Sequence, residues 1–206
     1  LAFSTAGGDT ASALAAGCTV VVKGHPAHAA TSELVSKAIE RAAHQCDMPA
    51  GVFNLVQGVT PEVSTQLVTD SAIKAVGFTG SERVGMILQA HINERAEPIP
   101  FYGELGSTNP QFILPELLEQ QAQELASTQV QSMLMGHGQF CTSPGVIVAI
   151  KGDSLNRYKA TLAQDIAAQS AASMLTAGIA SVYQSQIDTL LSNPKEELIA
   201  QGESSP

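Results

Sequence analysis

Residues 19–26 read TVVVKGHP and hold the first element of a repeating pattern. Thr19–Lys23 is apolar and β-branched up to its final lysine, as in a strand that is buried on both faces of a parallel sheet. A segment with helical spacing follows, and we expect Thr31 or Ser32 to cap it. Its apolar positions are Leu34, Val35, Ala38, Ile39, Ala42, Ala43 and Cys46. A buried strand that leads into an amphipathic helix predicts a βαβ unit.

The same alternation continues toward the C-terminus, with a period of about 30 residues. Val52–Val56 (VFNLV) and Ile73–Phe78 (IKAVGF) are the next predicted strands, and a short helix follows Pro61. Ser81 is expected to cap a further helix. The apolar face of that helix holds Val84, Ile87, Leu88, His91 and Ile92. The pattern predicts the α/β class, with a parallel βαβ sheet of the dinucleotide-binding type.

From residue 99 the pattern changes, and we place a domain boundary near Gly103–Leu105, giving domains 1–103 and 104–206. Strands are predicted at 99–104, 111–114 and 146–150, and helices at 116–135 and twice more after residue 150. The last helix is expected to turn five apolar residues inward: Ile179, Val182, Tyr183, Ile187 and Leu190. The polar tail at 193–206 is expected to be partly mobile.

Charge and cysteine content exclude several classes of function. The chain has 206 residues, a net charge of −9 and no run of Lys or Arg, so nucleic acids and anionic membranes are poor partners. No apolar stretch is long enough to span a bilayer. Three widely spaced cysteines fit a reducing, cytoplasmic compartment better than a disulfide framework. The chain begins at Leu1 in mid-pattern, so we expect it to be part of a larger protein.

Small and polar residues follow three predicted strands, where parallel sheets bind their ligands. These strand ends are Lys23-Gly24-His25, Gln57-Gly58 and Thr79-Gly80-Ser81. A glycine that opens a helix lets backbone N–H groups approach a phosphate, so the edge predicts a dinucleotide pyrophosphate site. The G-x-G-x-x-G fingerprint is absent, which disfavours an ordinary Rossmann dehydrogenase. Taken singly, each feature also fits a solvated lysine or an ordinary turn.

Cys141 lies in a glycine-rich turn, GHGQFCTSPG at 136–145, between a predicted helix and a strand. Such a turn can hold a thiol in an unusual backbone conformation beside exposed N–H groups. Cys18 and Cys46 lie in apolar patterns and are interpreted as small, inert hydrophobic residues. Glu104 ends an otherwise apolar strand, where it is either a solvated strand end or a general base.

Three segments in order resemble the motifs of the aldehyde dehydrogenase superfamily: FTGS at 78–81, ELGSTNP at 104–110 and GQFC at 138–141. GGDTASALAAG at 7–17 and KGHP at 23–26 resemble one branch, which includes 2,5-dioxovalerate and NADP-dependent fatty aldehyde dehydrogenases. The likeness is strong over residues 1 to about 150 and weak beyond them.

The resemblance implies that Cys141 is the nucleophile and Glu104 the general base in the oxidation of an aldehyde to a carboxylic acid. The reaction would pass through a thiohemiacetal and a thioester. The cofactor would be NADP or NAD. NADP is slightly favoured, because Pro26 replaces the glutamate of many NAD-preferring members and His25 lies beside it. The residues expected to bind the cofactor are Lys23, His25, Gly58, Gly80, Ser81, Val84 and Leu105.

By the same resemblance, three parts of the family's enzymes are not in this sequence. The asparagine that stabilises the oxyanion would precede Leu1, and two later parts are also absent: the segment that binds the nicotinamide ribose and the terminal strand used for oligomerisation. We therefore expect a truncated, inactive fragment of a homo-oligomeric enzyme. Two other functions remain open, a cysteine hydrolase or acyltransferase that uses no nucleotide, and a folded piece with no activity. No metal is expected, because neither His25 with His28 nor His44 with Cys46 has a second pair at zinc-site spacing.

Overall fold

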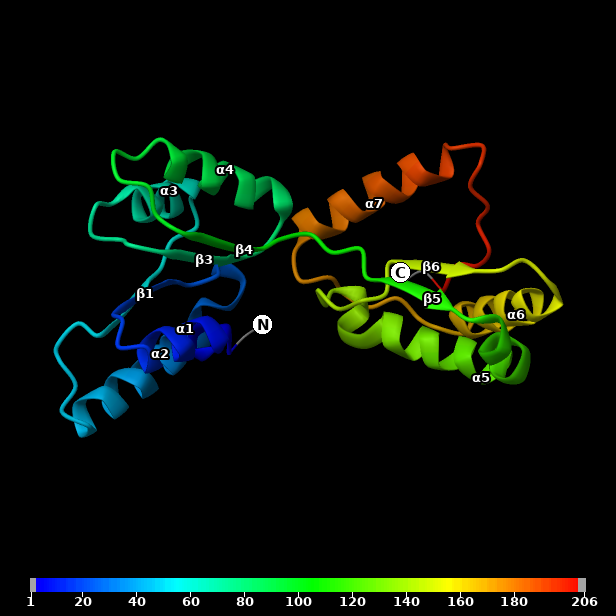
Figure 1. The fold of residues 1–206 in the computed structure, drawn as a ribbon, viewed down its shortest axis with the longest axis horizontal. Coiled ribbons are helices and arrows are strands. Elements are labelled where there is room, and N and C mark those ends of the chain that lie inside the picture. Colours follow the sequence, from blue (N-terminus) through cyan, green and yellow to red (C-terminus); the bar gives the residue numbers. More distant parts are fainter. Residues whose placement is uncertain (1–2, 204–206) are drawn as a thin grey trace. The chain divides into compact units, whose positions relative to one another are not determined.

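The computed structural model describes residues 3–203, which form two compact units, Leu1–Gly106 and Ser107–Pro206. The first unit contains α1 (Gly8–Ala15), β1 (Val20–Lys23), α2 (Ala29–Gln45), β2 (Phe53–Val56), α3 (Pro61–Thr69), β3 (Val76–Thr79), α4 (Glu82–Asn93) and β4 (Phe101–Glu104). The second contains β5 (Pro110–Ile113), α5 (Pro115–Leu134), β6 (Val146–Ala149), α6 (Asp153–Ala167) and α7 (Ala177–Leu191) (Figure 1).

Every strand pair is parallel and is joined by a helix, which confirms the predicted α/β class. Within residues 3–203 the pairs are β1 with β2, β3 with β4, and β5 with β6. Lys23 lies opposite Val56, and Thr79 lies opposite Glu104, so the strands of each pair end together. The sequence predicted one continuous sheet in the first domain, whereas the structure forms two separate strand pairs there. Short apolar runs predict strands, but they do not specify which strands are neighbours.

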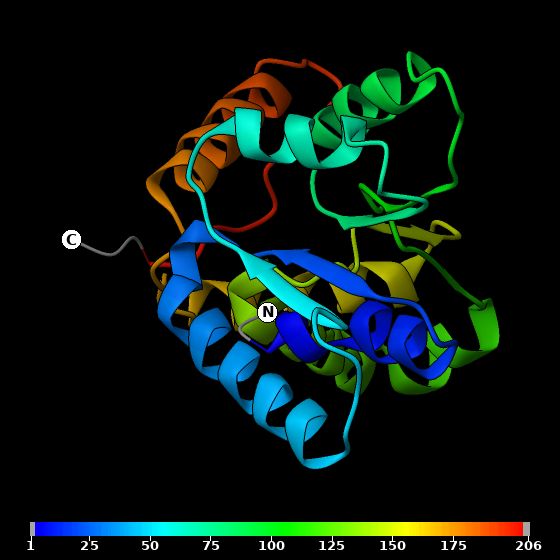
Figure 2. The same ribbon diagram turned by 90° about the vertical axis from the view of Figure 1, so that its left-hand side faces the viewer.

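Helix α2 begins earlier than the sequence predicts. A 3-10 turn at Pro26–His28 leads directly into the helix, and His25 caps the turn by accepting the Ala27 N–H at its Nδ1. Ser32 is therefore not a cap: it is fully buried inside α2, with its Oγ 3.1 Å from His28 Nδ1. α2 packs along β2 (Figure 2). Leu34, predicted to face the core, is 69% exposed.

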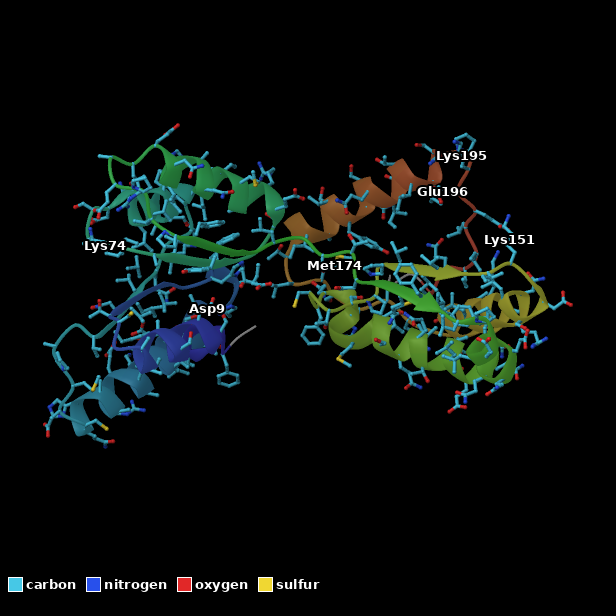
Figure 3. The ribbon with its side chains drawn as sticks, viewed as in Figure 1. Asp9, Lys74, Lys151, Met174, Lys195 and Glu196 are labelled. Carbon is cyan, nitrogen blue, oxygen red and sulfur yellow. The ribbon has the colours of Figure 1, made fainter. Side chains whose placement is uncertain are left out.

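Each unit has its own hydrophobic core. In the first unit, Val68, Leu88 and Ile92 from α3 and α4 pack against β3 and β4. This confirms Leu88 and Ile92 on the predicted face of α4, whereas Ile87, predicted on the same face, is 46% exposed. Asp9 of α1 lies over β3 in the same unit, where a Cβ atom at Gly77 would be 3.4 Å from its carboxylate (Figure 3). In the second unit, the core is built from α5 and α6 over β5 and β6, and burial raises the pKa of Tyr158.

The C-terminal part of the second unit differs from the sequence prediction. Four of the five α7 residues expected to point inward are exposed: Ile179 (42%), Val182 (58%), Tyr183 (51%) and Leu190 (54%). The tail, predicted to be partly mobile, is held at Glu203, whose backbone bonds to Gln169 and Ala171. Residues 204–206 lie outside the described part of the chain. No helix of residues 3–203 is both long and apolar enough to cross a membrane.

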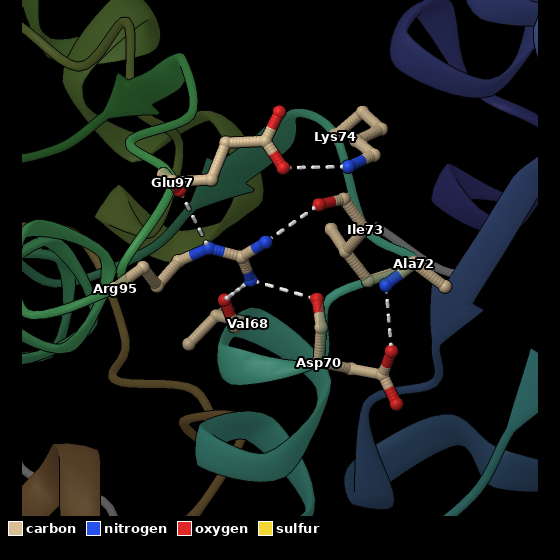
Figure 4. A network of polar contacts seen from close by, with 7 residues as sticks. All are labelled: Val68, Asp70, Ala72, Ile73, Lys74, Arg95 and Glu97. Carbon is tan, nitrogen blue, oxygen red and sulfur yellow. Dashed lines mark hydrogen bonds and ion pairs between the residues drawn. The ribbon is translucent and has the colours of Figure 1, made fainter.

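Arg95 links the ends of α3 and α4 through one guanidinium (Figure 4). Its Nη1 donates to the carbonyls of Val68 and Asp70 at 2.7 Å each, and its Nη2 donates to the Ile73 carbonyl at 2.9 Å. Beside it, a hydrogen bond from Lys74 at 2.8 Å and the charge of that ammonium lower the pKa of Glu97. Arg95 Nε also donates to the Glu97 carbonyl, at 3.3 Å. Because the planar guanidinium satisfies four carbonyls at fixed angles, Arg95 fixes the loop that leads into β3.

Arg95→Lys is expected to lower the free energy of unfolding of the first unit by about 2–3 kcal/mol, because an ammonium cannot reproduce the fork and leaves carbonyls without donors. Urea unfolding, followed by circular dichroism, measures the loss. The matched control is Arg83→Lys at an exposed position of α4, which should change stability by less than about 0.5 kcal/mol. Equal losses in the two variants would show that the Arg95 network contributes nothing specific.

Candidate active site

The cysteine loop, residues 135–145, has a strained backbone that its glycines make possible. Gly136, His137 and Gly138 have φ angles of 60°, 55° and 74°, so three consecutive residues are left-handed. For a residue with a side chain this conformation costs roughly 1–2 kcal/mol, so His137 must be held by its surroundings. The Phe140 ring packs on Gly136, where a Cβ atom would lie 3.0 Å from it. The glycine-rich sequence thus forms the unusual turn that it predicts.

Cys141 lies at the second position of a tight turn and is exposed. The turn is closed by a 3.1 Å hydrogen bond from the Ser143 N–H to the Phe140 carbonyl. The Cys141 N–H donates to no acceptor within residues 3–203. An accessible thiol beside an unused backbone donor is the arrangement that a cysteine nucleophile needs, because the donor can stabilise an oxyanion.

The segment 107–109, which leads into β5 of the second unit, is hydrogen-bonded to the cysteine loop. Asn109 Nδ2 donates to the carbonyls of Cys141 and Ser143, at 2.8 Å each. Ser107 Oγ donates to the Cys141 carbonyl at 2.6 Å. The Gly145 N–H donates to the Thr108 carbonyl at 3.1 Å. The sequence analysis named Ser107 and Asn109 only as members of the ELGSTNP motif and gave them no role. Their hydrogen bonds join residues more than 30 positions apart, so no local pattern indicates them.

Glu104 is the last residue of β4 in the first unit, and it is exposed. Its backbone carbonyl accepts the Gly80 N–H at 3.1 Å, which joins the ends of β3 and β4. The carboxylate is therefore at the carboxyl edge of a parallel strand pair, where the sequence placed it. Its role as general base stays a prediction, because Glu104 and Cys141 belong to different units.

The ends of β1 and β2 form one of the predicted strand-end clusters. The Gly24 N–H donates to the Val56 carbonyl at 2.9 Å, so Lys23 and Gly24 lie beside Gln57. A Cβ atom at Gly24 would be 2.7 Å from Gln57 Oε1, and one at Gly58 would be 2.7 Å from Val63 Cγ2. Gly58 is therefore required by local packing against the stiff Val63 side chain, whereas the Gln57 amide could move away from a side chain at position 24. Lys23 is half-buried and lies at the strand end, so its ammonium is the cation of this cluster.

His25 is held as an uncharged ring in this cluster. Its Nδ1 accepts the Ala27 N–H at 3.1 Å, and the ring stacks on His28 with centroids 5.4 Å apart. Partial burial, then the charges of His28 and Lys23, lower the pKa of His25 from its ordinary 6.5. At neutral pH the ring is neutral and offers Nε2–H as a donor, whereas protonation at lower pH would displace the Ala27 bond.

The ends of β3 and β4 form the second cluster. Ser81 caps α4 as predicted, since its Oγ accepts the Val84 N–H at 3.4 Å. A Cβ atom at Gly80 would be 2.6 Å from the Phe78 ring, so any larger residue here would force that ring to shift. Leu105 packs directly on Gly85 in the first turn of α4. The structure therefore brings Gly80, Ser81 and Leu105 together at one helix N-terminus.

Within residues 3–203, no group of three His, Cys, Asp or Glu side chains gathers at metal-binding distance. The two imidazoles that invited a metal interpretation are already engaged at Nδ1, His25 by the Ala27 N–H and His28 by Ser32 Oγ. The second pair, His44 and Cys46, is exposed at the end of α2.

Comparison with characterised proteins places this chain among enzymes of one family. It is 47% identical to alpha-ketoglutaric semialdehyde dehydrogenase 2 of Azospirillum brasilense and 43% identical to alpha-ketoglutaric semialdehyde dehydrogenase of Acinetobacter baylyi. Both matches cover 98% of this chain, which spans only 39% and 38% of the length of these relatives.

Solved structures agree with this assignment. A mutant of aldehyde dehydrogenase C from Pseudomonas syringae, solved with NAD+ and octanal, is 28% identical, with a TM-score of 0.62 over 76% of this chain and 30% of its own. A putative aldehyde dehydrogenase from Burkholderia cenocepacia has the same fold, with a TM-score of 0.78, 20% identity, and coverage of 96% of this chain and 41% of that one. The family model for aldehyde dehydrogenases matches residues 2–187. The chain therefore belongs to the aldehyde dehydrogenase family.

Proposed function

We propose that the protein containing this chain is an NAD(P)-dependent dehydrogenase that oxidises a small semialdehyde, of the α-ketoglutaric semialdehyde type, to the acid. The observation that supports this best is the accessible Cys141 thiol on a rigid loop, in a chain that is 47% identical to an enzyme named for that substrate. We further propose that the whole protein is a homo-oligomer in the cytoplasm, where three exposed, unpaired cysteines can persist.

In the proposed mechanism, the Cys141 thiolate attacks the aldehyde carbon and forms a thiohemiacetal. The Cys141 N–H stabilises the oxyanion, since it donates to no acceptor within residues 3–203. A bound nicotinamide, held by the first unit, would supply the acceptor for the hydride of this carbon, which leaves a thioester on Cys141. Glu104 then removes a proton from water, and the resulting hydroxide displaces the Cys141 sulfur from the thioester.

The first unit has groups that suit a dinucleotide. The first N–H groups of α4 have no acceptor within the helix, and Ser81 Oγ satisfies the one at Val84. The remaining donors, together with the helix dipole, would hold the pyrophosphate next to Gly80. Leu105 would meet the nicotinamide end and Val84 the adenine side, while Lys23 would hold the ribose or its phosphate. At neutral pH the uncharged His25 can add a hydrogen bond from Nε2.

The test is aldehyde-dependent reduction of NADP+ or NAD+ by the whole purified protein that contains this chain, followed by the absorbance of the reduced nicotinamide. With α-ketoglutaric semialdehyde, kcat/KM should exceed the value for octanal by at least about tenfold, because one missing polar contact can cost that much. Thioester hydrolysis without any cofactor-dependent oxidation would instead support a cysteine hydrolase, and the proposed function would be rejected.

Pro26→Glu is expected to raise the Kd for NADP+ by at least about tenfold, because a carboxylate three residues after Lys23 would repel a 2′-phosphate. The Kd for NAD+ should stay level or fall. Pro26→Gln is the matched control, since it also removes the proline from the 3-10 turn but adds no charge. Cofactor titration by fluorescence measures both. A Gln variant that loses NADP+ as strongly as the Glu variant would mean that the turn, not the charge, is responsible.

A further inference from the structure

One side-chain amide controls the backbone on both sides of Thr142. An amide nitrogen carries two hydrogens, and Asn109 Nδ2 lies 2.8 Å from the Cys141 carbonyl and 2.8 Å from the Ser143 carbonyl. The Cys141 carbonyl has a second donor, Ser107 Oγ at 2.6 Å. Both lone pairs of that oxygen are therefore used, and the peptide that follows Cys141 is fixed in orientation.

Asn109 is itself held rigidly. Its φ of 44° is left-handed, a conformation that asparagine tolerates better than most residues. The next residue, Pro110, opens β5 and is in register with Val146 of β6. At Gly145, a Cβ atom would lie 2.5 Å from the Thr108 carbonyl, so the two segments are as close as their backbones allow. The amide therefore acts from a backbone position that is fixed by its neighbours.

We propose that Asn109 is a positioning residue for the nucleophile. Asn109 fixes the peptide that follows Cys141, and the Ser143 N–H bond to the Phe140 carbonyl fixes the peptide that precedes it. Together these bonds orient the Cα–Cβ bond that carries Sγ and the Cys141 N–H. This inference rests on the proposed function, because it assumes that the Cys141 thiolate attacks the aldehyde. Rotation of that peptide would displace Sγ while leaving the thiol exposed, and a displacement of about 1 Å can cost roughly 100-fold in rate.

Asn109→Asp tests the proposal, because it keeps the shape of the side chain and replaces the donor with a carboxylate oxygen that faces two carbonyl oxygens. We expect kcat for aldehyde oxidation to fall about 100-fold. The KM for aldehyde and the Kd for cofactor should change less than threefold. Asn54→Asp is the matched control: the Asn54 amide also donates to a backbone carbonyl, that of Gly51 at 2.9 Å, and the charge change is the same.

Alkylation by iodoacetamide separates positioning from unfolding. This small reagent needs only an accessible sulfur, so its rate with Cys141 should change less than threefold in Asn109→Asp while oxidation falls. Peptide mass mapping distinguishes Cys141 from Cys18 and Cys46, which are also exposed. If Asn109→Asp is not folded at the assay temperature, Ser107→Ala replaces it. That variant removes one of two donors to the Cys141 carbonyl and should lower kcat by about 3–10-fold.

Cys141→Ala is assayed in parallel, so that failure of the proposed function can be distinguished from failure of the positioning role of Asn109. If it retains turnover, the proposed function fails, and the role of Asn109 fails with it. If Cys141→Ala is inactive while folded Asn109→Asp and Ser107→Ala both keep kcat within threefold of the parent, only the positioning proposal is overturned. A loss of oxidation in either variant that equals its loss of alkylation rate would overturn it as well, because the thiol would then be hidden rather than misplaced.

Discussion

Cys141→Ala is expected to abolish aldehyde oxidation, with a fall in kcat of roughly 10⁴-fold or more, because the remaining hydroxyls of the loop, Thr142 and Ser143, are far weaker nucleophiles than a thiolate. Cofactor affinity should remain within about threefold of the parent value. The candidate cofactor residues lie in the first unit and Cys141 lies in the second. Steady-state assays measure the first effect, and cofactor titration measures the second.

Cys18→Ala and Cys46→Ala are the matched controls for that prediction. All three cysteines are exposed, so loss of a reactive surface thiol is common to the three variants. Cys18 and Cys46, interpreted from the sequence as small, inert hydrophobic residues, are exposed, because each lies just beyond the end of a helix. Only the Cys141 variant should lose turnover. Turnover above one per cent in it, or an equal loss in a control, would refute Cys141 as the nucleophile.

Glu104→Gln is expected to lower steady-state kcat by about 10²–10³-fold, because a general base contributes of this order and an amide cannot accept the proton of water. Hydride transfer precedes this step. A pre-steady-state burst of reduced nicotinamide should therefore remain, with an amplitude close to one per active site, and the thioester should accumulate on Cys141. Rapid mixing and intact-protein mass spectrometry detect these two signals.

Glu94→Gln provides the control for the carboxylate, since Glu94 is an exposed residue that follows α4 in the same unit. It should retain both the burst and steady-state turnover. Disappearance of the burst in Glu104→Gln would assign this residue to acylation or to cofactor binding. Unchanged turnover would leave Glu104 as the solvated strand end that the sequence alone also allowed.

Local sequence patterns predicted most of the elements because they report local preferences. Short apolar runs predicted β1 and β2, helical spacing predicted α4 and α5, and Ser81 capped α4 as expected. The beginning of α2 was missed because Pro26 and His25 start a 3-10 turn that continues into the helix, so Ser32 lies in its interior. The sequence offered Thr31 or Ser32 as the cap, but the 3-10 turn at Pro26–His28 starts the helix before either residue.

The sequence by itself determined the α/β class, the alternation of strands and helices and the identity of the family, because these follow from short-range periodicity and from motifs contiguous in the chain. Only the tertiary structure decided that Asn109 bonds to the carbonyls of Cys141 and Ser143. It also decided that the apolar residues of α7 are exposed. Contacts between residues more than 30 positions apart depend on the path of the whole intervening chain, and no local pattern records that path.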